Sequence, residues 1–105
     1  MLGAYAGRML QASKRLIAIG YEAGYMAPTG YQVAIGHAAM RNPTTATENM
    51  AVGHEALIGA GSSTANYNTA LGNYTLASVT NAERNVAVGH HSLKQVTTGD
   101  DNVAV

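Results

Sequence analysis

Small and branched apolar residues follow one short pattern that returns along the chain. In its clearest form it reads Asn-Val-Ala-Val-Gly over residues 85–89, and related apolar-alanine-apolar-glycine runs occupy 17–20, 33–36, 50–53 and 69–72. The residues one and three positions before the glycine are mostly β-branched or aliphatic, and they share one face of an extended chain because side chains alternate along a strand. The pattern therefore predicts a short β-strand before each glycine.

The repeat has a nearly constant period. Its glycines are 17, 16, 17, 19 and 17 residues apart, and a last copy is cut off at Val105. Self-similarity at such a period indicates a solenoid, in which each repeat is one coil. We therefore expect a single repeat domain over residues 1–105, with about six coils centred on Gly3, Gly20, Gly36, Gly53, Gly72 and Gly89.

The repeat glycine needs a reason in the backbone. Glycine adopts a bend with positive φ at no steric cost, so we expect it to end each strand. The structural bends are expected at Gly20, Gly36, Gly53, Gly72 and Gly89.

The position two before the glycine is alanine in every copy that reaches it except the first, where Met1 stands. This column faces away from the Val/Ile column, and a residue that is always small indicates the close approach of another backbone. That backbone belongs either to a second chain or to another wall of the same chain. We assign the column to packing between chains: Ala18, Ala34, Ala51, Ala70, Ala87 and Ala104.

The flanking positions are regular as well. A small residue three after the glycine and a mostly apolar one four after it predict a second short strand, followed by a turn of variable length. Asn or Gln usually stands four before the glycine, where it can form a corner or a hydrogen-bonded amide ladder along the stack. A local amphipathic helix over residues 8–16 is the alternative for one segment.

Composition narrows the class of partner. Lys+Arg and Asp+Glu number 6 each, so the net charge is 0, which argues against nucleic acid or an anionic membrane as partner. Cysteine is absent, which excludes disulfides and thiolate metal sites. No apolar run approaches the roughly 20 residues of a membrane span, and the N-terminus lacks signal-peptide features. Phe and Trp are also absent, which is typical of a narrow interior filled by small side chains. Each repeat of this kind buries its apolar face only by packing against a neighbouring repeat or chain.

Three histidines share one register. His37, His54 and His90 each follow a repeat glycine, with Tyr21 and Asn73 in the intervening copies. Such a column could bind a metal or respond to pH. However, only His37 and His54 fall on adjacent coils, no carboxylate shares their column, and in a strand His91 would point away from His90. We therefore expect an exposed or interface position, with no metal and no cofactor.

Catalysis is not expected. Glycan hydrolysis needs two carboxylates at a set separation. Glu22 and Glu55 share a register, but the coil between them would place them ~10 Å apart by the strand spacing. Tyrosines can stack on sugar rings or complete the packing between rods. The weak candidates for receptor binding are Tyr21, His37, His54, Tyr74 and His90.

The motif Asn-Val-Ala-Val-Gly-x-x-Ser-Leu over 85–93, with its counterpart Glu-Asn-Met-Ala-Val-Gly-x-x-Ala-Leu over 48–57, resembles the head repeat of trimeric autotransporter adhesins of the YadA type. It is equally similar to Gly-rich repeats of phage tail fibres, which often contain Leu-x-x-x-Thr-Thr-Gly-Asp-x-Asn-Val-Ala-Val, as in 93–105. The resemblance covers most of the chain. It implies that each repeat is one turn of a left-handed parallel β-roll and that three chains pack side by side, which would make the alanine column the packing face of a trimer.

The resemblance implies attachment to a host surface, through a glycan or a protein. We expect a segment of a phage tail fibre or spike, located on the virion or outside the cell. The alternatives are the head of a bacterial adhesin, from which this chain departs by lacking a signal peptide, a stalk heptad and an anchor, and an extracellular filament of coils stacked end to end. The chain starts and stops within a repeat, so we expect either a fragment or uncapped ends that stack on neighbouring fibre segments. The sequence does not determine the receptor or whether the chain is of phage or bacterial origin. It also does not determine whether this segment binds the receptor or serves only as a spacer.

Overall fold

The computed structural model describes residues 2–8, 15–26, 30–42, 47–59 and 64–105. Within these residues the only regular secondary structure is the β-strand, and none of them lies in a helix that could span a membrane. Each strand ends just before a repeat glycine or, in the last copy, before Val105, which confirms the predicted positions. The strands are β1 (Arg15–Ile19), β2 (Tyr31–Ile35), β3 (Met50–Val52), β4 (Thr69–Leu71), β5 (Val86–Val88) and β6 (Val103–Ala104).

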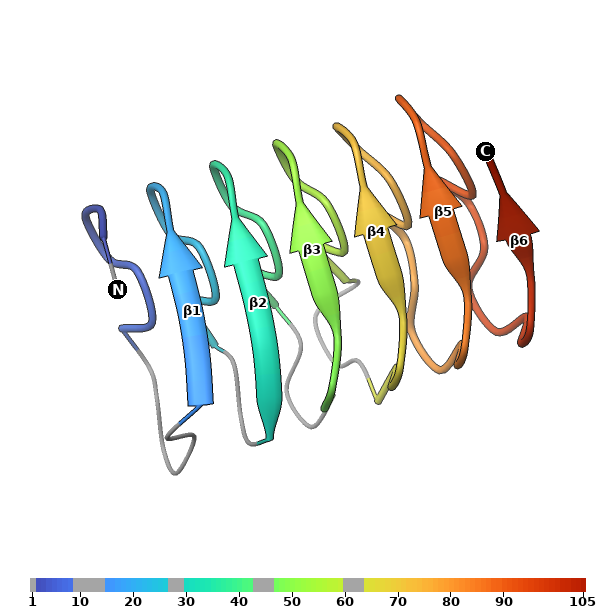
Figure 1. The fold of residues 1–105 in the computed structure, drawn as a ribbon, viewed down its shortest axis with the longest axis horizontal. Helices are drawn as coiled ribbons and strands as arrows, with labels where there is room; N and C mark the ends of the chain where they lie inside the picture. Colours follow the sequence, from blue (N-terminus) through green and yellow to red (C-terminus); the bar gives the residue numbers. More distant parts are fainter. Residues whose placement is uncertain (1, 9–14, 27–29, 43–46, 60–63) are drawn as a thin grey trace.

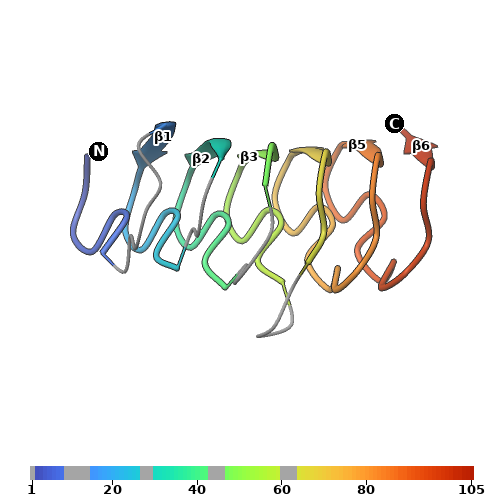
Figure 2. The ribbon, with the colours of Figure 1, turned by 90° about the horizontal axis from the view of Figure 1, so that it is seen from below.

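The strands form one parallel sheet in the order β1-β2-β3-β4-β5-β6 (Figure 1). Equivalent repeat positions are paired, for example Ala34 with Ala51, and the first copy joins through a bridge between Leu2 and Ile19. The chain makes one turn between successive strands, so it is a β-solenoid of about 5 turns, as Figure 2 shows. Its extents are 30 × 22 × 19 Å, in keeping with coils that rise ~4.8 Å each.

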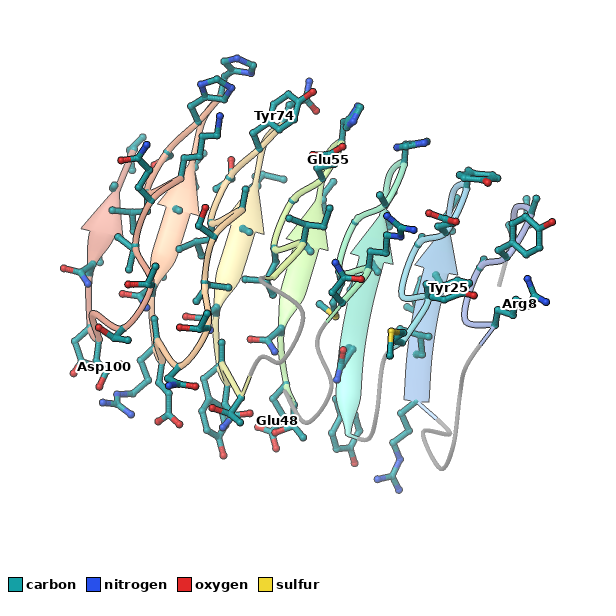
Figure 3. The ribbon with its side chains drawn as sticks, turned by 180° about the vertical axis from the view of Figure 1, so that it is seen from behind. Arg8, Tyr25, Glu48, Glu55, Tyr74 and Asp100 are labelled. Atoms are coloured by element: carbon teal, nitrogen blue, oxygen red, sulfur yellow. The ribbon has the colours of Figure 1, made fainter. Side chains whose placement is uncertain are left out.

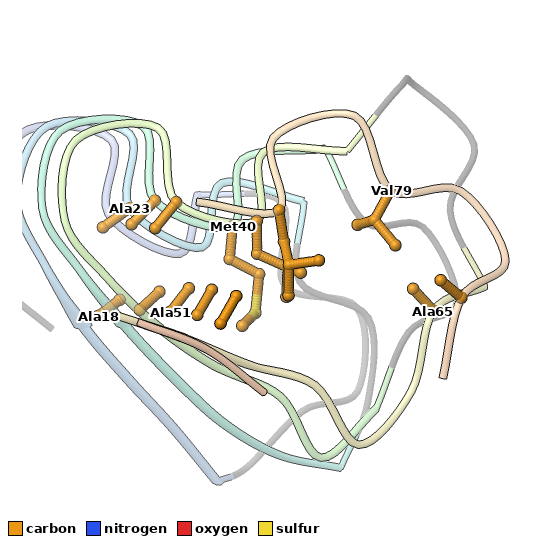
Figure 4. Packing of buried hydrophobic residues seen from close by; sticks show 14 residues of the cluster. Ala18, Ala23, Met40, Ala51, Ala65 and Val79 are labelled. Carbon is orange, nitrogen blue, oxygen red and sulfur yellow. The ribbon is translucent and has the colours of Figure 1, made fainter. Parts of the chain in front are cut away.

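The alanine column lies inside the coil, so its assignment to trimer packing is wrong. Ala18, Ala34, Ala51, Ala70 and Ala87 have no exposed surface within a single chain, and Ala104 is partly buried at the end of the sheet. The opposite wall of the same coil supplies their neighbours, and Figure 4 shows Ala18 and Ala51 facing Ala23 and Met40. The column is small because the two walls of one chain lie close together.

The repeat glycines confirm the predicted bend and have a second role. Their φ angles lie between 117° and 134°. A Cβ on Gly36 would lie 2.5 Å from the carbonyl oxygen of Gly53 in the next coil, so a side chain has no room. Glycine therefore satisfies both the backbone bend and the close stacking of one coil on the next.

The segment after each glycine is a turn, so the predicted second strand is absent from the described residues. Two residues of each turn are left-handed, as at Glu55 (φ 53°) and Leu57 (φ 51°). These two residues reverse the chain within a few positions and direct Leu57 into the interior. The turns still bond from coil to coil, because the Glu55 N–H donates to the His37 carbonyl at 2.9 Å.

The predicted amide ladder is confirmed, and its members are Asn49, Asn68, Asn85 and Asn102. The backbone N–H of Asn68 donates to Asn49 Oδ1 at 2.8 Å, and that of Asn85 donates to Asn68 Oδ1 at 3.0 Å. The side-chain amides also donate hydrogen bonds of 2.8 Å to backbone carbonyls: Asn49 to Ala65, Asn68 to Ala82 and Asn85 to Gly99. This asparagine ladder fixes the corner that leads into β3, β4, β5 and β6.

One early copy of the repeat has a larger apolar residue at one interior position and a smaller residue at another. Leu16 stands where later copies have Asn or Gln, and Gly24 stands where they have Met or Leu. A Cβ on Gly24 would lie 3.1 Å from a Leu16 methyl group, so the leucine fills the space left by the glycine. Since Arg15 and Leu16 belong to β1, the helical alternative fails there. Residues 9–14 of that alternative lie outside the described residues.

Candidate functional site

The first candidate surface is the outer face of the sheet, which carries the Val/Ile column. Strand alternation places these side chains opposite the buried alanines. Several are largely exposed, among them Ile17 (54%) and Val103 (74%), and others such as Val52 are half-buried. A continuous exposed apolar face of this kind marks an interaction surface. We name it the outer sheet face; its exposed members are Leu2, Ile17, Ile19, Met50, Leu71, Val86, Val103 and Val105.

A ridge of polar and aromatic residues borders this face at the position five before the glycine. It consists of Arg15, Tyr31, Glu48, Tyr67, Arg84 and Asp101. Its members interact along the stack: the Arg15 guanidinium lies 4.6 Å from the Tyr31 ring centre, and Arg84 Nε bonds Asp101 Oδ1 at 2.6 Å. The Arg84 hydrogen bond lowers the pKa of the Asp101 carboxyl. Sequence analysis did not predict this ridge. Its residues share one repeat position, but their types vary too much to mark that position as a site.

The second candidate surface is a column of rings along the turns. The five receptor-binding candidates all lie in it, so the structure brings them together. Successive ring centres are 5.3 Å apart for Tyr21 and His37, 4.8 Å for His37 and His54, and 5.1 Å for His54 and Tyr74. His90 follows Tyr74 at 6.0 Å.

We name this column the ring ladder; Tyr5 and His91 complete it. In the copy after Gly72, the residue after the glycine is Asn73, which has no ring, and the next residue, Tyr74, supplies the ring instead. Figure 3 shows Tyr74 at the turn edge of the coils. The rings of Tyr21 and His37 are nearly parallel, so each covers one face of the other, whereas the rings of Tyr74 and His90 meet edge to face.

His90 and His91 lie together, which corrects the expectation that they point apart. Their ring centres are 4.0 Å apart and nearly parallel. The alternation of a strand does not apply here, because the segment is a turn with His91 at φ 61°. Partial desolvation lowers the pKa of His91, and the nearby His90 and Lys94 lower it further.

Acidification is therefore expected to protonate His91 only below the ordinary histidine pKa of about 6.5. Because the unfolded chain binds this proton more readily, the contribution to stability is lost as pH falls below that value. Proton NMR titration of the ring signals checks this, with urea denaturation at neutral and acidic pH. His90→Gln should raise the pKa of His91 in part. A wild-type pKa at or above the ordinary value would contradict the proposed environment.

One carboxylate approaches the ring ladder, contrary to the sequence expectation. Glu55 Oε1 lies 3.2 Å from His54 Nε2. One potential ligand atom each from His37, His54 and Glu55 lies within 4.8 Å of the others. Glu22 holds the same register but pairs with Arg41 at 2.8 Å. Sequence reasoning missed this cluster because it assigned adjacent positions to opposite faces of a strand.

Comparisons of this chain with protein-family models, with curated protein sequences and with solved structures gave no match.

Proposed function

We propose that this chain is a structural and adhesive segment of a trimeric phage tail fibre or spike that attaches to a host surface. In this proposal each coil is one turn of a left-handed parallel β-roll, and three chains pack side by side. The observation that carries the proposal is the outer sheet face, because it leaves one column of aliphatic strand side chains exposed at the surface of a single chain.

The outer sheet face suits packing against copies of itself. Its side chains repeat at every coil, ~4.8 Å apart, so two identical faces can meet along the whole rod. Burying aliphatic surface contributes about 25 cal/mol per Å², and closed symmetric assemblies are the common form of homo-oligomers. The resemblance of the repeat to adhesin heads favours three chains over two.

Attachment is assigned to surfaces that such packing leaves free. The ring ladder belongs to the turns and not to the outer sheet face (Figure 3). It offers imidazole nitrogens and phenol hydroxyls on a stiff support, which suits a glycan or a protein of the host.

The proposal predicts that charge on the outer sheet face prevents assembly without unfolding the chain. Met50 and Leu71 are each 44% exposed, so Met50→Lys and Leu71→Lys are tolerated by the single chain and place unpaired charges in the packed trimer. Light scattering over a range of concentrations should give a trimer mass for the wild type. The double variant should give a monomer mass with an unchanged circular dichroism spectrum.

Gln95→Lys is the matched control, because Gln95 is exposed in a turn. It should remain a trimer. A wild type that stays monomeric would sink the proposed assembly, and open-ended growth of mass would favour the filament instead.

A further inference from the structure

We propose that His37, His54 and Glu55 bind a divalent transition-metal ion of the Zn²⁺ class. All three residues lie in the turns of adjacent coils, and a single chain provides them. The site therefore exists whether or not the chain forms a trimer, and it goes beyond the attachment role proposed above.

The distances suit such an ion. Zinc binds imidazole nitrogen and carboxylate oxygen at about 2.0–2.2 Å, so two ligand atoms of a tetrahedral site lie roughly 3.3 Å apart. His54 Nε2 and Glu55 Oε1 already lie 3.2 Å apart. All three ligand atoms lie within 4.8 Å of one another, so the His37 nitrogen has only a short distance to move when the ion binds.

The scaffold holds the ligands in place. The Glu55 N–H donates to the His37 carbonyl at 2.9 Å, and the His54 N–H donates to Asn73 Oδ1 at 2.9 Å. The His37 ring stacks on Tyr21, while the His54 ring packs against Tyr74. These contacts reduce the conformational entropy that the ligands lose when the ion binds.

The donor set selects the class of ion. Two imidazoles and one carboxylate suit zinc and its transition-metal neighbours, whereas Mg²⁺ and Ca²⁺ prefer oxygen donors alone. Within the described residues the only ion-pair partner of Glu55 is His54, so no Arg or Lys competes with the metal. His37 is exposed and the other two are half-buried, which leaves the remaining coordination positions open to water or to a group from another molecule.

The test is a titration of the full chain with ZnCl₂ at neutral pH, by calorimetry against a competing chelator. We expect one ion per chain. His37→Gln and Glu55→Gln each remove one ligand and should weaken binding at least about tenfold. The double variant His90→Gln/His91→Gln is the control, because it removes the other two ladder imidazoles, and it should bind as the wild type does. MgCl₂ should not bind.

A second measurement does not depend on the variants. In the wild-type chain, NMR signals of the His37 and His54 rings should shift on addition of Zn²⁺, and those of His90 and His91 should not. The proposal is overturned if the wild type binds no Zn²⁺ up to about 1 mM. It is also overturned if binding survives both ligand variants or is lost in the control.

Discussion

Gly53→Ala is expected to destabilise the solenoid by more than about 3 kcal/mol. Gly53 has φ 134°, which alanine rarely adopts. The new Cβ would also lie 2.5 Å from the Gly72 carbonyl oxygen and 2.6 Å from its carbon. Because both atoms belong to the backbone of the next coil, no side-chain rotation relieves the clash. Urea denaturation followed by circular dichroism measures the loss.

Gly89→Ala separates the two causes. Gly89 has a similar φ of 117°, but a Cβ there would have no atom within 4 Å. Its cost is therefore the backbone term alone, about 1–3 kcal/mol. Equal losses for the two variants would contradict the glycine-on-glycine contact between coils.

Asn68→Ala is expected to lower the free energy of unfolding by about 2–5 kcal/mol. The Asn68 side chain is completely buried and donates to the Ala82 carbonyl at 2.8 Å. It also accepts from the Asn85 backbone N–H at 3.0 Å and from Asn85 Nδ2 at 3.1 Å. Alanine leaves the Ala82 carbonyl and the Asn85 N–H without these partners inside the coil, and each such group costs about 1–3 kcal/mol. The same denaturation experiment measures the change.

Asn102→Ala is the control within the asparagine ladder. Asn102 is half-buried, and its side chain donates to Asn85 Oδ1 at 2.9 Å. Its removal should cost about 1 kcal/mol, the usual net value of one hydrogen bond. If Asn68→Ala costs no more than Asn102→Ala, water replaces the buried amide and the ladder does not hold the coils together.

The repeat glycines and the asparagine ladder explain how a coil with so thin an interior is stable. Alanine buries little apolar area, so the strand interior contributes less hydrophobic stabilisation than a core of larger aliphatics would. Close backbone stacking at the glycines and buried amide bonds at the asparagines add specific contacts between coils. The aliphatic side chains of the outer sheet face are largely exposed in a single chain, and the proposed assembly would bury them. The stability of the chain is therefore expected to rise with assembly.

The sequence predicted the column of rings in the candidate site, but it did not predict the side-chain contacts that determine the chemistry of the site. The shared register of His37, His54 and His90 predicted one column, and the structure places all three in the ring ladder. The approach of Glu55 to His54, and of His91 to His90, was not predicted. Both contacts depend on left-handed residues in the turn, which pair positions that a strand would separate.

The sequence by itself determined the period, the strands, the bend at each glycine and the amide ladder, because these follow from residues that recur at one register. Only the tertiary structure decided which strand face is inside. Alternation shows that the alanine and Val/Ile columns face opposite ways, but it is symmetric between inside and outside. The left-handed turns direct Met40, Leu57 and Leu76 into the interior, and these larger side chains leave room only for alanine on the strand wall that faces them.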